Sequence, residues 1–286
     1  MFRLRSNSLA VCVSFGSMQE KREKEQQGLT SMLQANAGRF LLVVPFEKSD
    51  RLLKMDFTAS NTELTDEVLN NTERFTDYVN AKIRNYEAKY GIGGYGEHRT
   101  IYSRSKVFYM APQIFEEGDA LTQPLLMPDV VNSNDTSPVW EKSEEPRRLH
   151  LGTDIWGKPY TKVMAPLDGI VHSFAFNNAY GDYGATIILT HNLDGQIFHT
   201  LYGHLSLNSL KNLQGGERIS RGDVFCEFGI PFENGQWPPH LHFQIIEDMQ
   251  GLKGDYPGVC RFSEREKYLA NCPDADLILG MMQLAT

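Results

Sequence analysis

Three features are missing from this 286-residue chain, and each absence argues against a class of protein. No run of about 18 apolar residues occurs, so a membrane-spanning helix is not expected. No block rich in lysine and arginine occurs and the formal charge is −8, so a nucleic-acid partner, which requires a basic stripe, is not expected. No Cys-x-x-Cys spacing occurs among the four cysteines, which argues against a cysteine-ligated zinc site.

The compartment stays open on the sequence alone. Two arginines precede a short apolar stretch within residues 1–17, but no Ala-x-Ala cleavage site follows, so this segment is expected to be poorly ordered or weakly signal-like. The chain would lie in the cell envelope or periplasm if it is exported, and in the cytoplasm otherwise. Cys260 and Cys272 could pair in an oxidising compartment, although two free thiols are the simpler expectation. Cys226 is expected in a buried strand.

Residues 18–90 predict a helical N-terminal region that packs on a core. A moderate apolar stripe runs through residues 18–37. Residues 62–90 are the clearest helical tract, because apolar residues recur three, four or seven positions apart until Gly91. Between them, residues 40–45 are a candidate for a short apolar strand.

The rest of the chain predicts a core of residues 91–260 and a C-terminal helical segment of residues 261–286, giving a mainly β fold that is α+β overall. Residues 109–148 are rich in proline, acidic residues, asparagine and serine, which indicates a long insertion or a lid. After it, short β-rich runs alternate with turn residues, as in an antiparallel sheet, sandwich or open barrel. The expected strands are 163–165, 169–175, 185–190, 198–204, 224–228 and 242–246. Ser263 and Glu266 form a capping-box pattern that predicts the start of the C-terminal helix.

Glu97, His98 and Arg99 follow a run that contains four glycines within residues 91–96. No Gly-Lys-Ser/Thr follows, and the run comes after a predicted helix rather than a strand, so a phosphate-binding loop is not expected. The glycines instead predict a tight loop that brings the three polar side chains near a site.

Four histidines and one aspartate, in three short motifs, offer ligands for a metal ion. His240 and His242 are two residues apart, and side chains at i and i+2 of a strand face the same way. His150 and Asp154 are four residues apart, and Gly152 between them permits a bend and a close approach of the backbone. His150, Asp154 and one of the paired histidines would give a zinc ion three ligands and leave a fourth position for water.

The remaining imidazole of the pair and His204 are candidates for proton transfer. Bound zinc brings the pKa of its water to about 7 and polarises a carbonyl. Imidazoles beside it can accept a proton, donate one to a leaving amine or stabilise developing charge. Tyr202 precedes His204 by two residues, so its phenol is expected on the same face. The other histidines are expected on the surface or hydrogen-bonded in the core: His98, His172, His191 and His199.

The order of these motifs resembles the lysostaphin-type zinc metallopeptidases, also known as the LytM-like or β-lytic family. Those enzymes carry His-x-(Gly)-x-Asp, an internal His-Leu-Ser and a terminal His-Leu-His-Phe, and all three occur here in order. Residues 161–171 resemble the family's strand-turn-strand after the aspartate, and residues 220–224 resemble its basic/Gly/Asp turn. The resemblance covers about residues 91–246.

The resemblance implies a compact antiparallel β-sheet core with a groove, of the duplicated-hybrid-motif type. It implies one zinc ion per chain, held by His150, Asp154 and His242. It also implies that His204 and His240 are the catalytic imidazoles.

The implied function is a zinc endopeptidase that hydrolyses peptide bonds in peptidoglycan cross-links with zinc-activated water. Two alternatives remain: a non-catalytic binding or regulatory module of the same fold, and a cytoplasmic hydrolase of another peptide or amide. Non-catalytic members have lost metal ligands, whereas this chain keeps three ligands and both histidines, which favours the enzyme. The family's loop before the first ligand carries a glycine-rich turn and an arginine. Candidate substrate-binding residues are Arg99, Glu97 and His98 from this loop, and Tyr202 from its expected position beside His204.

Overall fold

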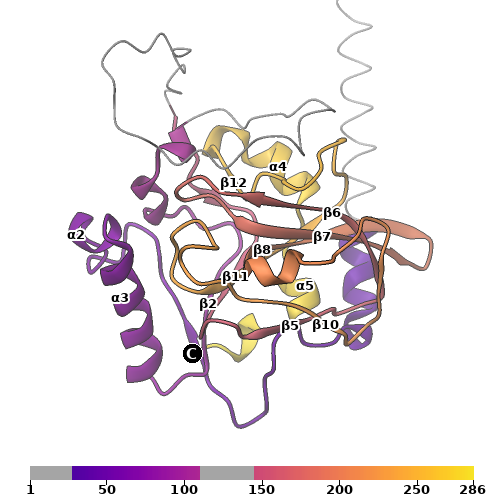
Figure 1. Cartoon of the computed structure of the whole chain (residues 1–286), viewed down its shortest axis with the longest axis horizontal. Coiled ribbons are helices and arrows are strands. Elements are labelled where there is room, and N and C mark those ends of the chain that lie inside the picture. The colour runs from indigo at the N-terminus through magenta and orange to yellow at the C-terminus, as the bar shows by residue number, and fades with distance from the viewer. Residues whose placement is uncertain (1–27, 110–144) are drawn as a thin grey trace, which may run out of the picture.

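The computed structural model describes residues 28–109 and 145–286, which form a β-sheet core with helices around it (Figure 1). Eight strands form the main sheet in the order β1-β2-β4-β11-β8-β7-β6-β9. All neighbouring pairs are antiparallel except β1 and β2, so the predicted antiparallel core is confirmed and carries one added parallel pair. The strand bounds are β1 Leu52–Lys54, β2 Tyr90–Gly93, β4 Thr153–Trp156, β6 Gly169–Asn177, β7 Gly184–Leu193, β8 Gln196–Leu205, β9 Arg218–Ile219 and β11 His240–Ile246.

Two small sheets and several short helices complete the described part of the chain. The small sheets pair β5 Lys162–Met164 with β10 Val224–Glu227, and β3 Leu149–His150 with β12 Val259–Cys260. In Figure 1, α2 and α3 lie at one side of the sheet, the helix of residues 28–35 lies at the other, and α4 lies near β12. The α-helices are α2 Asp66–Leu69, α3 Thr72–Asn85, α4 Arg265–Asn271 and α5 Asp276–Leu279. The 3-10 helices are η1 Ala37–Arg39, η2 Ile101–Arg104, η3 Lys106–Tyr109, η4 Leu207–Leu210, η5 Phe262–Glu264 and η6 Met282–Leu284.

Within the described ranges, no helix combines the length and the apolar character that crossing a membrane requires. The three cysteines in these ranges are buried free thiols, and Cys226 lies in strand β10 as expected.

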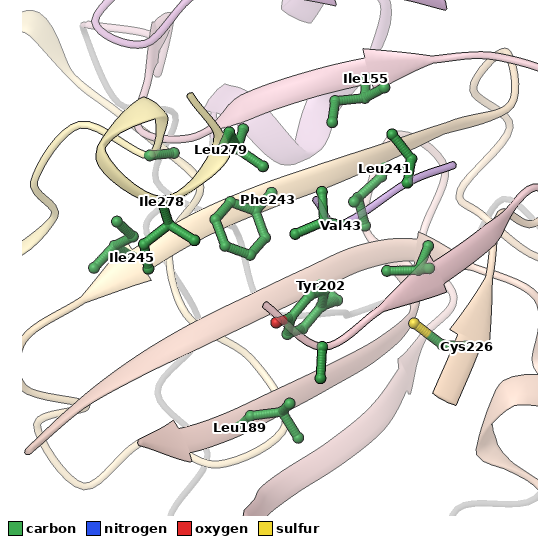
Figure 2. Close-up of a cluster of buried hydrophobic side chains, with 14 of the residues drawn as sticks. Val43, Ile155, Leu189, Tyr202, Cys226, Leu241, Phe243, Ile245, Ile278 and Leu279 are labelled. Atoms are coloured by element: carbon green, nitrogen blue, oxygen red, sulfur yellow. The ribbon is translucent and has the colours of Figure 1, made fainter. Parts of the chain in front are cut away.

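Strand β11 is buried on both faces, and its alternation decides which residues reach the site. The odd-numbered residues from Leu241 to Ile245 point into the main apolar cluster (Figure 2). Successive side chains of a strand point to opposite faces, so the even-numbered residues from His240 to Gln244 lie on the other side. Each buried apolar side chain contributes about 1.5–3 kcal/mol to folding. A one-residue shift in register would exchange these side chains for the histidines, so the core fixes the histidines' direction.

The predicted helical tract of residues 62–90 is interrupted in the structure. Helix α2 ends at Leu69 and α3 begins at Thr72, because Asn71 is an N-cap whose Oδ1 accepts a hydrogen bond from the Arg74 N–H at 3.0 Å. Helix α3 ends at Asn85, five residues before the predicted end of the tract.

The first half of the glycine-rich run after this tract is a strand, and the predicted turn is confined to residues 95–96. Residues 91–93 belong to β2, where Gly91 faces Trp156 and Gly93 faces Asp154 of β4. Strand β2 is buried throughout, because β1 and β4 pair with its two edges and side chains cover it. Such a strand shows no alternation of polar and apolar residues that could reveal it in the sequence.

Residues 40–45 are not the strand that their apolar character predicted. Val43 and Val44 are fully buried, but the segment has irregular backbone. Its hydrogen bonds to the core include Met164 N–H to Val43 O at 2.8 Å and Leu41 N–H to Pro166 O at 3.0 Å. Burial of the two valines is thus achieved without the repeated pairing of a strand.

The capping box predicted at Ser263 and Glu266 is wrong, although the C-terminal helix exists. Helix α4 begins at Arg265, and Glu264 at its N-cap makes no side-chain capping bond. The Ser263 N–H donates instead to Glu145 Oε1 at 3.1 Å, and its hydroxyl donates to the same carboxylate. Glu145 therefore accepts the hydrogen bonds of Ser263 in place of Glu266, the acceptor that the capping box predicted.

Residues 1–17 and most of the predicted insertion of residues 109–148 lie outside the described part, and the domain boundaries stay a prediction. The ends of the insertion lie side by side, because the Arg147 N–H donates to Phe108 O at 2.7 Å. The chain thus leaves the core and returns to it at one place.

His191 of β7 is expected to make the fold sensitive to acid. Its Nδ1–H donates to Asp168 O at 2.8 Å, its Nε2 lies 2.7 Å from the Thr200 hydroxyl, and burial lowers the pKa of the imidazole from 6.5 to about 4. The unfolded chain therefore binds a proton first as the pH falls from 6.5 towards 4. Stability is lost across that window, by about 2 kcal/mol at pH 5 from this group.

We expect His191→Gln to be less stable than the wild type at pH 7 but to lose less further stability at pH 5. Urea unfolding of both metal-free proteins at the two pH values measures this difference. If both proteins lose the same free energy of unfolding between pH 7 and pH 5, His191 is not the group that causes the loss at acid pH.

Candidate metal centre

Three buried donor atoms from three strands converge on one point. His150 lies at the end of β3, Asp154 in β4 and His242 in β11, where His242 is paired in register with Asp154. The distances are 3.0 Å between His150 Nε2 and His242 Nδ1, 3.0 Å between His242 Nδ1 and Asp154 Oδ1, and 3.2 Å between His150 Nε2 and Asp154 Oδ1. In the described ranges this is the only group of three or more such side chains that could hold a metal ion.

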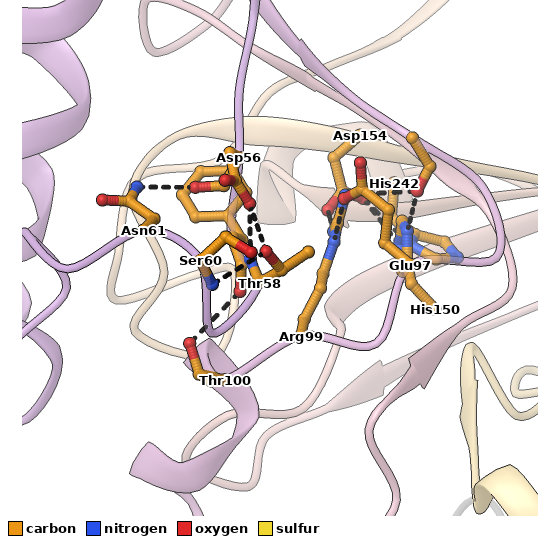
Figure 3. Close-up of polar contacts among 12 residues, drawn as sticks. Asp56, Thr58, Ser60, Asn61, Glu97, Arg99, Thr100, His150, Asp154 and His242 are labelled. Atoms are coloured by element: carbon orange, nitrogen blue, oxygen red, sulfur yellow. Dashed lines mark hydrogen bonds and ion pairs between the residues drawn. The ribbon is translucent and has the colours of Figure 1, made fainter.

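Arg99 fixes the orientation of the Asp154 carboxylate, as Figure 3 shows. Its Nη1 donates to Asp154 Oδ2 at 2.6 Å and its Nε donates to Glu97 Oε2 at 3.0 Å. Because Oδ2 is occupied, Oδ1 is the oxygen that faces the histidines. Burial would raise the pKa of Asp154, but its interactions with His150 and Arg99 hold that pKa well below its usual range. The carboxylate is therefore ionised, as a metal ligand must be.

Two glycines make room for this arrangement. A Cβ on Gly93 would lie 2.4 Å from Arg99 Nη2, and a Cβ on Gly152 would lie 2.7 Å from His242 Nε2. Any larger residue at either position would displace a side chain of the centre.

Each ligand histidine has its other ring nitrogen bound to an acceptor. The Nδ1–H of His150 donates to Gly94 O at 3.2 Å, which leaves the Nε2 lone pair for a metal. The Nε2–H of His242 donates to Gln244 Oε1 at 2.9 Å, which leaves Nδ1. Gln244 is held in turn, because its Nε2 donates to Pro257 O and to Cys272 Sγ, each at 3.2 Å. Such partners fix the tautomer and the ring orientation of a metal-binding histidine.

Gln244 was not predicted from the sequence, although its position two residues after His242 on a strand placed it on the same face. We expect Gln244→Leu to weaken metal binding about 10- to 100-fold, because His242 would lose the acceptor that fixes its tautomer. Gln244→Glu keeps an acceptor and should retain most of the affinity. Competition with a zinc chelator measures both, and equal affinities for the leucine variant and the wild type would contradict this role.

His204 and His240 lie together beside the three donor atoms, with ring centroids 4.1 Å apart. The His240 ring also stacks on Trp156 at 3.9 Å. The Nδ1–H of His204 donates to Asn234 O at 2.9 Å, and the Nδ1–H of His240 donates to Pro238 O at 2.7 Å. Since a carbonyl only accepts hydrogen bonds, each Nε2 keeps a lone pair.

Both of these imidazoles are neutral near pH 7. Burial lowers the pKa of His240 to about 4 and lowers that of His204 well below its usual value. His204 also has a left-handed backbone, with φ 62°, a conformation that is uncommon for a residue other than glycine. Its N–H donates to Tyr183 O and its carbonyl accepts from Gly229 N–H, both at 2.9 Å, and these bonds hold the residue there.

The positive φ of His204 corrects one prediction. Tyr202 does not share the face of His204: its side chain is fully buried in the main apolar cluster, and its hydroxyl lies 3.1 Å from Thr200 Oγ1. His98 is exposed against Phe262, at a ring distance of 6.2 Å, and is not among the metal ligands.

Residues 148–253 match the sequence profile of peptidase family M23. This segment, which is less than half of the chain, is similar to the M23 peptidases. It contains all five predicted histidine and aspartate positions and excludes Glu97 and Arg99, which precede it. The match and the His-Asp-His group together support a metallopeptidase.

Known relatives of the M23 segment cover only parts of this chain. An uncharacterized metalloprotease from Haemophilus influenzae is 28% identical over 140 residues, which are 46% of this chain and 27% of that protein. This chain thus matches about a quarter of that relative's length. The catalytic domain of the antimicrobial peptidase lysostaphin from Staphylococcus simulans is 22% identical, with 42% of this chain and 80% of that one covered and a TM-score of 0.30. A zinc-containing peptidase from Vibrio cholerae is 26% identical, with 34% and 27% covered and a TM-score of 0.28.

Proposed function

We propose that this chain is a zinc-dependent endopeptidase that hydrolyses peptide bonds, with peptidoglycan cross-links as its substrate. The observation that carries the proposal is the set of three buried donor atoms, each 3.0–3.2 Å from the others. A tetrahedral zinc site with bonds of about 2.0–2.1 Å has edges of about 3.3 Å, so the donors fit zinc with little movement. Two nitrogens and one carboxylate oxygen are also ligands of catalytic zinc sites.

Bound zinc would supply a Lewis acid and lower the pKa of a water molecule, which is the chemistry that amide hydrolysis needs. His150 Nε2, His242 Nδ1 and Asp154 Oδ1 would hold it. Arg99 offsets the negative charge of Asp154 and keeps Oδ2 from turning inward.

His204 and His240 would move the proton. Their Nε2 lone pairs make them acceptors in the resting state, so one of them takes the proton from the attacking water. The same Nε2–H then donates to the nitrogen of the leaving amine. An imidazole here can stabilise an oxyanion only after it has been protonated, because its second nitrogen is already used by a backbone carbonyl.

The test is incubation of the purified zinc form with purified sacculi and with free cell-wall peptides, followed by mass spectrometry of the products. We expect new amine and carboxyl termini at one kind of peptide bond. A zinc-depleted sample and the Asp154→Asn variant are the matched controls. Cleavage of neither substrate by the zinc form would overturn the peptidoglycan assignment.

A further inference from the structure

Two buried arginines lie near the centre, and within the described part of the chain only Arg99 has a counter-ion. Arg99 is fully buried and pairs with Glu97 and Asp154. Arg104, at the end of η2, is 7% exposed, and among residues 28–109 and 145–286 no carboxylate forms an ion pair with it. A buried charge without a partner is costly, so the second case calls for an explanation.

The Arg104 guanidinium is enclosed by aromatic rings and by neutral oxygens. Its Cζ lies 4.8 Å from the Trp237 ring centroid, 5.1 Å from that of Tyr180 and 5.3 Å from that of Phe75. Its Nε and Nη2 donate to the Tyr180 hydroxyl at 3.2 and 2.8 Å, and Nη2 also donates to Thr72 Oγ1 at 2.9 Å. This cage holds the cation in place without neutralising it.

Within the described residues, two buried donors of this cage have no acceptor. Arg104 Nη1 and Trp237 Nε1 are both buried, and neither makes a hydrogen bond within the described part of the chain. Buried donors in folded proteins are nearly always paired. The group that would satisfy both must accept hydrogen bonds, and a carboxylate also supplies the missing negative charge.

The cage adjoins the reacting imidazoles. Trp237 forms the shared wall, since its ring centroid is 6.2 Å from His204 and 6.5 Å from His240. The guanidinium therefore lies within about 11 Å of the His204 ring, a span of about three residues of extended peptide.

We propose that Arg104, together with the Trp237 indole N–H, binds a carboxylate of the peptide substrate two or three residues from the cleaved bond. The inference rests on the proposed peptidase function and adds a specificity to it. Tyr180, which is 42% exposed and lies over the guanidinium, is the side chain that the substrate displaces.

Matched peptides test this subsite: one carries a free C-terminal carboxylate at that distance from the cleaved bond, and the other carries a carboxamide there. The wild type should favour the carboxylate by about 10-fold or more in kcat/KM, the value of a charge-assisted hydrogen bond. Arg104→Met should lower cleavage of the carboxylate peptide to the level of the carboxamide and leave the carboxamide unchanged. Arg104→Lys keeps the charge and should keep part of the preference. Arg74→Met, which removes an exposed arginine paired with Glu67, is the control and should keep all of it.

If Arg104 has a purely structural role, the methionine variant should show the same fold decrease in kcat/KM for both peptides. That result would overturn the inference. Equal cleavage of both peptides by the wild type also overturns it while leaving the proposed function intact. If the wild type cleaves neither peptide, the proposed function fails. In that case the subsite is tested by binding alone, with calorimetry of the two peptides on the wild type and on Arg104→Lys. Equal affinities of the wild type for the carboxylate and the carboxamide peptide would reject the subsite. The lysine variant also decides the matter if the methionine variant does not fold.

Discussion

His242→Ala is expected to release zinc and to abolish hydrolysis. The substitution removes one of three ligand atoms, and the affinity should fall by more than the roughly 10- to 100-fold that follows loss of a ligand's hydrogen-bonding partner. His150→Ala should behave in the same way, because its Nε2 lies 3.0 Å from His242 Nδ1 and faces the same point. Zinc content per chain after gel filtration and chelator competition measure the effect.

The matched control for these variants is His172→Ala, a half-buried histidine of β6 outside the centre. It should keep one zinc ion per chain. Retention of zinc at unchanged affinity by either ligand variant would contradict the assignment of that ligand.

His204→Ala is expected to keep zinc and to lose turnover by about 10²- to 10⁴-fold, the usual contribution of a positioned acid or base. His204 donates no atom to the three-donor group, yet its ring lies against that of His240. Its Nδ1–H is bound to a carbonyl, so the Nε2 lone pair is what the substitution removes. Zinc content and kcat, measured on the same sample, separate the two effects.

His199→Ala is the control on the same strand, since that residue lies in β8 and contacts Thr190 and His172 instead of the centre. It should keep both zinc and turnover. Because His204 has a positive φ, His204→Gly is a second variant that removes the imidazole without backbone strain. Full activity in either His204 variant would remove it from the mechanism.

The strands that could be predicted are short β-rich runs that turn residues separate in the sequence. The positions of β5, β6, β7, β8, β10 and β11 were predicted to within a few residues, whereas the two-residue strand β9 was not predicted. Strand β2 was missed because side chains cover it and it contains glycines, which leave no pattern. The break between α2 and α3 was missed because it depends on one cap, at Asn71, within a continuous apolar period.

Some residues of the candidate site could likewise be placed from the sequence, and others could not. His240 and His242 were placed correctly, because alternation along a strand is a local rule. Tyr202 was misplaced because a single positive φ, at His204, breaks that rule and cannot be read from spacing. Strand alternation places Gln244 on the face of His242, but the contact of Gln244 with Pro257 and that of Arg104 with Trp237 are visible only in the folded structure.

The most direct test of the account is a zinc titration of the metal-free protein while hydrolysis of a cell-wall peptide is followed. The account predicts that the rate rises in proportion to added zinc and stops rising at one zinc ion per chain. His242→Ala should show no such rise at the same zinc concentrations. Hydrolysis at full rate without zinc, or a background rate with one zinc ion bound, would contradict it.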